Sequence, residues 1–171
     1  MKVLRHWKKV LENDLDYIVS EMKDAITPPA VVILSGPVGA GKTTFTKRFV
    51  KLITGPGVAS GPARAQEYEV LSPTYSIINE TGNLAHADFY RIKEKEELVH
   101  LEIPLYLENK DFFIVEWGRP FLSFLKREVD ERFKFYDLEI STNPAGEPIP
   151  KATDGDARDL CSRNFILSEI P

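Results

Sequence analysis

A glycine-rich stretch, SGPVGAGKTT at residues 35–44, holds the residue types and the spacing best suited to chemistry. It matches the pattern G-x-x-x-x-G-K-[ST] at Gly36, Gly41, Lys42 and Thr43. Glycines let the backbone curl so that successive N–H groups converge on one anion, and a helix that follows adds the positive end of its dipole. The lysine supplies a charge for phosphate oxygens, and the threonine hydroxyl can ligate Mg²⁺. The stretch therefore predicts a loop that binds nucleotide phosphates.

The segments on both sides of this P-loop (residues 36–43) are those that a phosphate-binding loop requires. AVVIL, residues 30–34, is continuously apolar and rich in β-branched side chains, which is typical of a parallel strand buried on both faces. KTTFTKRFVKLIT, residues 42–54, repeats apolar residues at helical spacing. We expect Lys42 also to assist catalysis through its charge on the β- and γ-phosphates. The residues expected to bind the nucleotide here are Gly36, Val38, Gly39, Ala40, Gly41, Lys42, Thr43 and Thr44.

A P-loop site also needs an acid on the metal side, usually at the end of another buried strand. The apolar segment DFFIVE ends in Glu116, and the segment LAHADFY contains Asp88. We predict that Glu116 binds the metal or a metal-bound water, together with Thr43. Asp88 either contacts metal-bound water or orients the attacking water, and the sequence leaves the division of roles open. Between loop and acids, a Ser-Pro-Thr segment ends at Thr74, which we interpret as a switch residue that senses the γ-phosphate, the alternative being a simple turn.

The other segments predict one α/β domain over residues 1–171, of the P-loop NTPase type, with a mixed, mostly parallel sheet flanked by helices. Apolar residues at helical spacing predict a helix over about 12–26, and FKFYDLEIS predicts an edge or half-exposed strand. Residues 142–160 are polar and are expected to form a loop. Further strands are expected in YEVL, YSIINE, LAHADFY and NFILSEI, with a hairpin turn at residues 81–83 and a charged helix in KEKEELVHL.

Composition limits the remaining classes of protein. The 171 residues are 43% hydrophobic and 28% charged, and the net charge of −4 argues against a large nucleic-acid footprint. The single cysteine, Cys161, excludes an internal disulfide and a cysteine-based zinc site. Charges interrupt the apolar residues near the N-terminus, so we expect no secretory signal, no membrane partner and a cytoplasmic location.

Three other functions remain to be weighed against nucleotide hydrolysis. A guanine-specific switch would carry N-K-x-D, but here Asp111 follows Asn109-Lys110 one place too early, so this segment is interpreted as a turn. A small-molecule or nucleotide kinase is the stronger rival, although such kinases usually add an arginine-rich lid. A module that binds nucleotide without hydrolysing it is the third. The arginines of the C-terminal third are scattered rather than clustered: Arg127, Arg132, Arg158 and Arg163.

Blocks that agree in order and approximate spacing, GPVGAGKTTFTK, SPTYSIINE, HADFYRI and VEWG, resemble the TsaE (YjeE) family over roughly residues 11–125. These are small bacterial ATPases of tRNA threonylcarbamoyladenosine (t6A) synthesis. The resemblance implies binding of ATP and Mg²⁺, slow hydrolysis in isolation, and work with TsaB and TsaD, through which tRNA is contacted indirectly. It implies that Thr43 and Glu116 hold Mg²⁺, that Asp88 supports hydrolysis, that Thr74 is the switch residue, and that Trp117 lies near the nucleotide or a partner.

Two features near these blocks leave alternatives open. The family usually has an acid shortly after E-W, whereas here Arg119 occurs, which either stabilises phosphate charge or faces solvent. His86 alternates with Asp88 on one strand, so it either hydrogen-bonds that acid or a phosphate, or is a structural histidine. Near the start of the chain, Trp7 is expected to anchor the N-terminal segment to the fold rather than to lie near the adenine.

Overall fold

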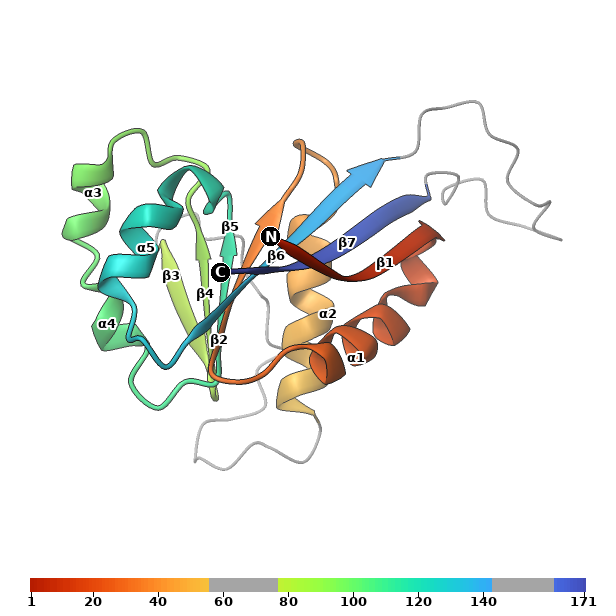
Figure 1. Ribbon diagram of the computed structural model, residues 1–171, viewed down its shortest axis with the longest axis horizontal. Helices are drawn as coiled ribbons and strands as arrows, with labels where there is room; N and C mark the ends of the chain where they lie inside the picture. The colour runs from red at the N-terminus through yellow and green to blue at the C-terminus, as the bar shows by residue number, and fades with distance from the viewer. Residues whose placement is uncertain (56–76, 143–161) are drawn as a thin grey trace, which may run out of the picture.

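The computed structural model describes residues 1–55, 77–142 and 162–171. In them, a single seven-stranded sheet has the order β1-β7-β6-β2-β5-β4-β3, which can be followed in Figure 1. The strands are β1 Lys2–Val10, β2 Ala30–Ser35, β3 Ile78–Thr81, β4 Leu84–Asp88, β5 Phe112–Glu116, β6 Lys134–Thr142 and β7 Arg163–Ile170.

The central strands of the sheet are parallel and the outer ones antiparallel. β2 pairs in parallel with β5 and with β6, and β4 pairs in parallel with β5. The pairs β1–β7, β6–β7 and β3–β4 are antiparallel. The predicted mixed sheet is therefore confirmed, with its parallel pairing confined to the core. Because β2, β5 and β4 run the same way, their carboxyl ends meet at one edge, where open α/β sheets bind ligands.

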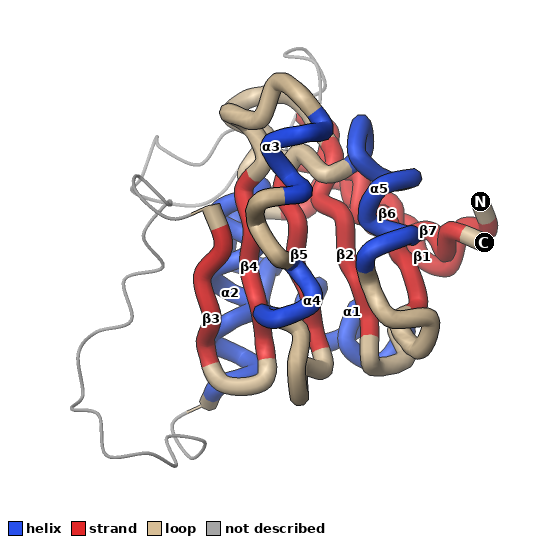
Figure 2. The backbone as a smooth tube through the Cα atoms, turned by 90° about the vertical axis from the view of Figure 1, so that its left-hand side faces the viewer, coloured by secondary structure: helices blue, strands red, loops and turns tan. Residues whose placement is uncertain are grey.

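Helices cover both faces of the sheet, as Figure 2 shows. α1 and α2 pack on one face over a core that contains Val32, Leu34 and Phe45. α3, α4 and α5 cover the other face, over a second core that contains Val31 and Ile33. The alternation of β2 residues between two cores explains why AVVIL is apolar throughout. The helices are α1 Leu15–Ala25, α2 Lys42–Thr54, α3 Lys95–Val99, α4 Ile103–Tyr106 and α5 Leu122–Glu128, with 3-10 turns at Glu12–Asp14 and Arg119–Phe121.

Several expected elements are confirmed and some lie outside the described residues. The helix expected over 12–26 is a 3-10 turn followed by α1, and the hairpin expected at 81–83 joins β3 to β4 with Thr81 opposite Leu84. The strand expected in YEVL, the switch residue Thr74, Cys161 and most of the polar loop at 142–160 fall outside the described residues.

The first strand was not expected from the sequence. β1 forms an edge of the sheet, and along it only Trp7 and Val10 are buried, so its apolar side chains are too sparse to show a strand pattern. The Trp7 indole nitrogen donates a hydrogen bond of 2.7 Å to Glu21 on α1. This bond and the burial of the ring confirm the expectation that Trp7 anchors the N-terminal segment.

The prediction that FKFYDLEIS forms an edge or half-exposed strand is wrong. The corresponding strand, β6, is interior, with β2 on one side and β7 on the other. Phe135, Tyr136, Asp137 and Leu138 are all buried on it. The alternating polar residues predict a solvent-exposed face, but the carboxylate of Asp137 is buried and hydrogen-bonded to Ser35 and Arg119.

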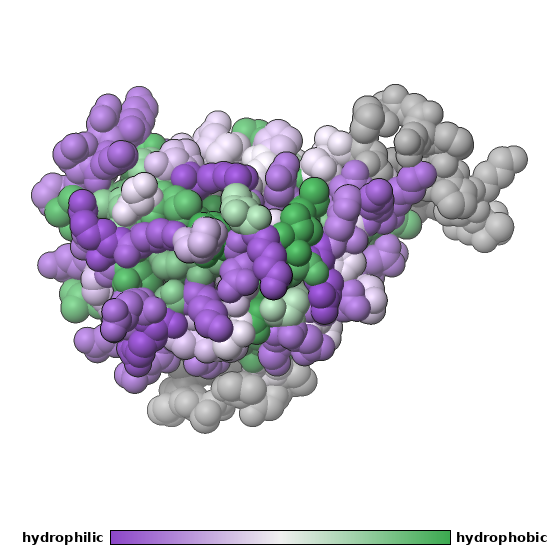
Figure 3. All heavy atoms as spheres, in the orientation of Figure 1, coloured by the Kyte–Doolittle hydropathy of each residue, from purple (hydrophilic) through white to green (hydrophobic). Residues whose placement is uncertain are grey.

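The surface has no single dominant apolar face in the view of Figure 3, where hydrophilic side chains surround several separate apolar areas. None of the helices in the described part of the chain has the length and apolar character that crossing a bilayer requires.

Candidate nucleotide-binding site

The P-loop connects the end of β2 to the start of α2 in a conformation that depends on glycine. Gly36, Gly39 and Gly41 have φ values of 140°, 78° and 102°, a region that side chains disfavour. A Cβ added to Gly36 would overlap the carbonyl oxygen of Ile140 on β6. Gly41 immediately precedes α2 and is its N-cap residue. The loop thus lies against β6 and delivers the first N–H groups of α2 to the carboxyl edge of the sheet.

Lys42 is folded back over its own loop. Its Nζ donates hydrogen bonds of 2.8 Å to the carbonyl oxygens of Gly36 and Pro37, and lies 3.8 Å from the centre of the Trp117 ring. Burial lowers the pKa of Lys42, while the nearby charges of Glu116 and Asp88 raise it. The ammonium group is therefore held in the loop and is largely shielded from water. An anion that enters the cleft can replace the two carbonyl oxygens as its partners.

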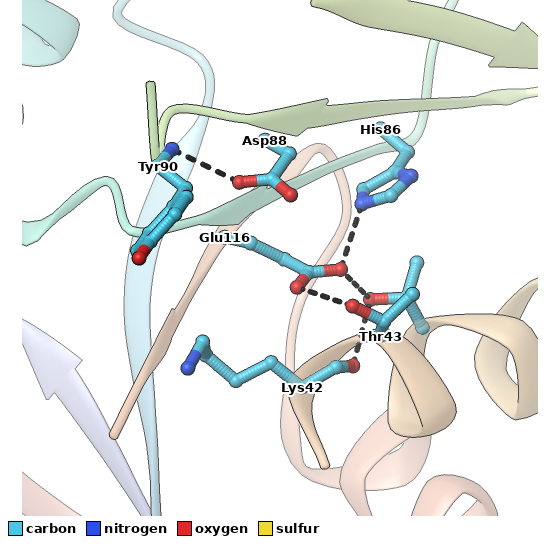
Figure 4. Close-up of polar contacts among 7 residues, drawn as sticks. Lys42, Thr43, His86, Asp88, Tyr90 and Glu116 are labelled. Atoms are coloured by element: carbon cyan, nitrogen blue, oxygen red, sulfur yellow. Dashed lines mark hydrogen bonds and ion pairs between the residues drawn. The ribbon is translucent and has the colours of Figure 1, made fainter. Parts of the chain in front are cut away.

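Glu116 is the centre of a buried hydrogen-bond network at the end of β5 (Figure 4). The side chain is only 2% exposed. The Thr43 hydroxyl donates to its Oε2 at 2.8 Å, and the Thr46 hydroxyl lies 3.2 Å from its Oε1. His86 Nε2 is 3.0 Å from the same Oε1, so the ring donates its N–H to the carboxylate. These bonds to the carboxylate hold it in one orientation against the start of α2.

The residues present fit a magnesium ion. The Thr43 hydroxyl and the Glu116 carboxylate are hard oxygen ligands that already lie in contact. Mg²⁺ is commonly held by one or two protein oxygens, with water and substrate phosphates completing its coordination. Residues 1–55, 77–142 and 162–171 contain no cluster of three or more His, Cys, Asp or Glu side chains that could hold a metal ion.

Asp88 lies beside Glu116, since the two are register partners at the ends of β4 and β5. Its Oδ1 accepts a hydrogen bond of 3.0 Å from the backbone N–H of Tyr90. His86 is bonded to Glu116, and no hydrogen bond joins it to Asp88 among those of the described residues. The structure therefore brings both predicted acids to the carboxyl edge of the sheet, and the hydrogen-bond partner of His86 is Glu116.

Aromatic side chains form one side of the cleft. Trp117 has a φ of 60°, and its ring centre lies 5.1 Å from that of Tyr90. Tyr90 and Val38 are exposed, so they form part of the rim. The cleft has a volume of about 400 Å³ and is lined by Val38, Gly39, Gly41, Lys42, Thr43, Thr44, Asp88, Tyr90, Glu116, Trp117 and Arg163.

Arg119 faces solvent with 50% of its side chain exposed, the second of its two expected alternatives, and it also pairs with a buried carboxylate. Its Nη1 donates to Oδ2 of Asp137 at 3.1 Å, while Ser35 donates to Oδ1 of the same carboxylate at 2.6 Å. Burial raises the pKa of Asp137, whereas the bonds from Ser35 and Arg119 lower it. Through the Asp137 carboxylate, Arg119 is thus linked to Ser35, the residue that precedes the P-loop.

Arg163 is a cleft residue that the sequence did not single out. It is the first residue of β7 and lines the cleft beside the P-loop. The sequence signal that could have found it is its position just before the predicted strand NFILSEI. Side chains two residues apart on a strand share a face, so Arg163 shares a face with the apolar Phe165. The segment Asn109-Lys110-Asp111 lies at the start of β5, at the opposite end of that strand from Glu116, which confirms its interpretation as a turn.

A model of the family described as Threonylcarbamoyl adenosine biosynthesis protein TsaE matches residues 11–145. The chain belongs to the TsaE family. The relative from Bacillus subtilis strain 168, named tRNA threonylcarbamoyladenosine biosynthesis protein TsaE, is 33% identical over 122 residues, which are 69% of this chain and 68% of the relative. The Haemophilus influenzae protein of the same name is 34% identical over 92 residues, covering 52% of this chain and 51% of that one.

Some of the matches span less than two thirds of the relative's length. The Rickettsia felis protein is 27% identical over 111 residues, which are 63% of this chain but 58% of the relative, so the match spans less than two thirds of that protein. Among solved structures, the crystal structure of Bacillus subtilus YdiB covers 100% of this chain and 89% of its own, with a TM-score of 0.52 and 20% identity. That similarity supports the fold alone.

Proposed function

We propose that the chain binds ATP with Mg²⁺ at the P-loop cleft and hydrolyses it, in support of t6A modification of tRNA with homologues of TsaB and TsaD. The observation that carries the proposal is the contact of Thr43 with Glu116, whose charge acts on the ammonium of Lys42 in the same cleft. A hydroxyl, a carboxylate and an ammonium group together at the carboxyl edge of the sheet support a site for a metal-bound triphosphate.

Each residue has a distinct part in this proposal. Lys42 exchanges its carbonyl partners for β- and γ-phosphate oxygens and offsets their charge. Glu116 and Thr43 hold Mg²⁺, which supplies charge neutralisation for the phosphates when bound. Asp88, fixed by the Tyr90 amide, orients the attacking water or a metal-bound one. Thr74, as the residue that senses the γ-phosphate, stays a prediction.

The partners are proposed from family membership. Relatives that match this chain carry names that place them in tRNA threonylcarbamoyladenosine biosynthesis. The net charge of −4 favours a protein that reaches tRNA through partners rather than through its own whole surface. Within the proposal, TsaB and TsaD supply the remaining help for hydrolysis, and tRNA is contacted through their complex. A cytoplasmic location likewise stays a prediction.

Adenine is proposed as the base because the guanine alternative has no support at the cleft. Lys110 and Asp111 are bonded at the far end of β5, to Gly82 and Asn83. A side chain there is separated from the P-loop edge by the length of the strand.

The test is release of inorganic phosphate from Mg-ATP, by the protein alone and with the cognate TsaB–TsaD pair. We expect slow release alone and faster release with the pair. Lys42→Ala should abolish both, whereas Lys51→Ala, which removes an exposed lysine from the far end of α2, should leave both unchanged. Wild-type turnover by Lys42→Ala would contradict the proposed site. Nucleotide binding with no phosphate released in either condition would favour a kinase that lacks its acceptor, or a module that only binds.

A further inference from the structure

Arg163 stands at the end of the sheet where the P-loop lies. It begins β7 and is paired with Thr142, the last residue of β6, which runs parallel to β2. Side chains two residues apart on a strand share a face, so Arg163 points to the same side as Phe165. The Phe165 ring lies 5.9 Å from that of Phe45 on α2. The face that carries Arg163 is therefore the one that packs on α2.

The arginine side chain lies directly over the last glycine of the P-loop. An ideal Cβ built on Gly41 would be 3.2 Å from Nε of Arg163 and 3.6 Å from both its Cδ and its Cζ. Gly41 is followed by Lys42, Thr43 and Thr44, which line the same cleft as Arg163. Arg163 is thus a second cationic side chain of the cleft, reaching it from a strand far along the chain.

The order of the strands indicates which part of a nucleotide Arg163 faces. Glu116 and Asp88 lie on β5 and β4, on one side of β2, whereas Arg163 lies on β7, on the other side. β5 and β7 are three strand spacings apart, roughly 14 Å. If the metal and γ-phosphate lie at the acids, as the proposed function requires, the α-phosphate and ribose extend toward β6 and β7.

We propose that Arg163 binds the α-phosphate of the nucleotide, a group that ATP, ADP and AMP share. The inference rests on the proposed function, because the orientation of the nucleotide follows from the metal site. A guanidinium can hold two phosphate oxygens at once, and a lysine holds them less specifically. Arg163 increases affinity and takes no part in breaking the β–γ bond. It lies beyond residues 11–145, the segment that the TsaE family model matches.

The experiment measures binding of ADP and of the non-hydrolysable analogue adenylyl imidodiphosphate by titration calorimetry. Arg163→Gln should weaken both about tenfold or more, since a hydrogen bond to a charged group accounts for about that much in an equilibrium constant. The loss should be equal for the two ligands, and kcat at saturating ATP should be unchanged. Arg163→Lys should recover part of the affinity. Arg132→Gln is the matched control, because Arg132 is exposed and bonded to Asp130. It lies just before the start of β6, at the end of that strand far from the cleft.

The outcomes separate the inference from the proposed function. Wild-type affinity in a folded Arg163→Gln variant would overturn the inference and leave the proposed function standing. A loss confined to the ATP analogue would overturn it too, because it would place Arg163 at the γ-phosphate. If neither nucleotide binds to the wild-type protein, both proposals fail. Thermal unfolding without nucleotide shows whether Arg163→Gln is destabilised. If it is, Arg163→Lys provides the test. Full wild-type affinity in an Arg163→Lys variant with a normal melting temperature would overturn the proposed guanidinium–phosphate contact.

Discussion

Two glycines of the P-loop provide a matched pair for testing how closely the loop is packed. Gly36 and Gly39 both have positive φ, so an alanine is strained at either position. A Cβ on Gly36 would also overlap the backbone oxygen of Ile140, whereas a Cβ on Gly39 would meet nothing within 4 Å. Backbone strain costs about 1–2 kcal/mol for Gly39→Ala. For Gly36→Ala, strain and overpacking against a backbone group that cannot easily move together cost about 2–6 kcal/mol.

The assay is urea unfolding of the nucleotide-free variants, followed by tryptophan fluorescence and extrapolated linearly to water. Gly36→Ala should lower the free energy of unfolding more than Gly39→Ala by about 1–4 kcal/mol, with similar slopes in urea. Calorimetric titration with ADP should then show that Gly36→Ala binds nucleotide more weakly, because the loop has moved away from β6. Equal destabilisation by the two substitutions would refute the packing of Gly36 against Ile140.

Two further predictions concern buried carboxylates. Glu116→Gln keeps the shape of the side chain but removes its charge, so Mg²⁺-dependent phosphate release should fall at least about 100-fold while metal-free nucleotide binding is retained; equal losses would argue against the metal role. The pKa of Asp137 is raised above its usual value of 3.8, chiefly by burial, so the folded state disfavours the ionised form. The contribution of Asp137 to stability is therefore full below about pH 4 and lost as pH rises through the raised pKa. In denaturant unfolding, Asp137→Asn should lack this fall, and identical pH profiles for the two proteins would contradict it.

The parts of the fold that were predicted correctly depend on local sequence. β2, the P-loop and α2 are consecutive, and each shows its own pattern of apolar residues or glycines. The two acids were located because each ends or follows an apolar strand, and parallel strands bring their carboxyl ends together. Their adjacency, with Asp88 opposite Glu116, needed no more than the assumption that β4 and β5 are neighbours.

The errors concern pairings between distant segments. Nothing local to residues 2–10 indicates that they add a strand to β7, because only two of their side chains are buried. The polar residue Asp137 suggested an exposed strand, since its partners Ser35 and Arg119 come from elsewhere in the chain. For the same reason the sequence indicates only a phosphate ligand or a solvent-facing residue at Arg119, whereas this half-exposed side chain is also the partner of a buried carboxylate.

The order of strands separates two contributions to nucleotide handling. Lys42, Asp88 and Glu116 all fall within the residues that the TsaE family model matches, and they lie at the P-loop and on β4 and β5. Arg163 approaches from β7, outside that segment and on the other side of the P-loop strand. Substitutions among the first group should therefore alter turnover, whereas substitutions at Arg163 should alter affinity alone. β7 is paired with β6 on one side and β1 on the other, so the sheet fixes the position of its first residue, Arg163. This position does not depend on the hydrolytic residues of the P-loop, β4 and β5.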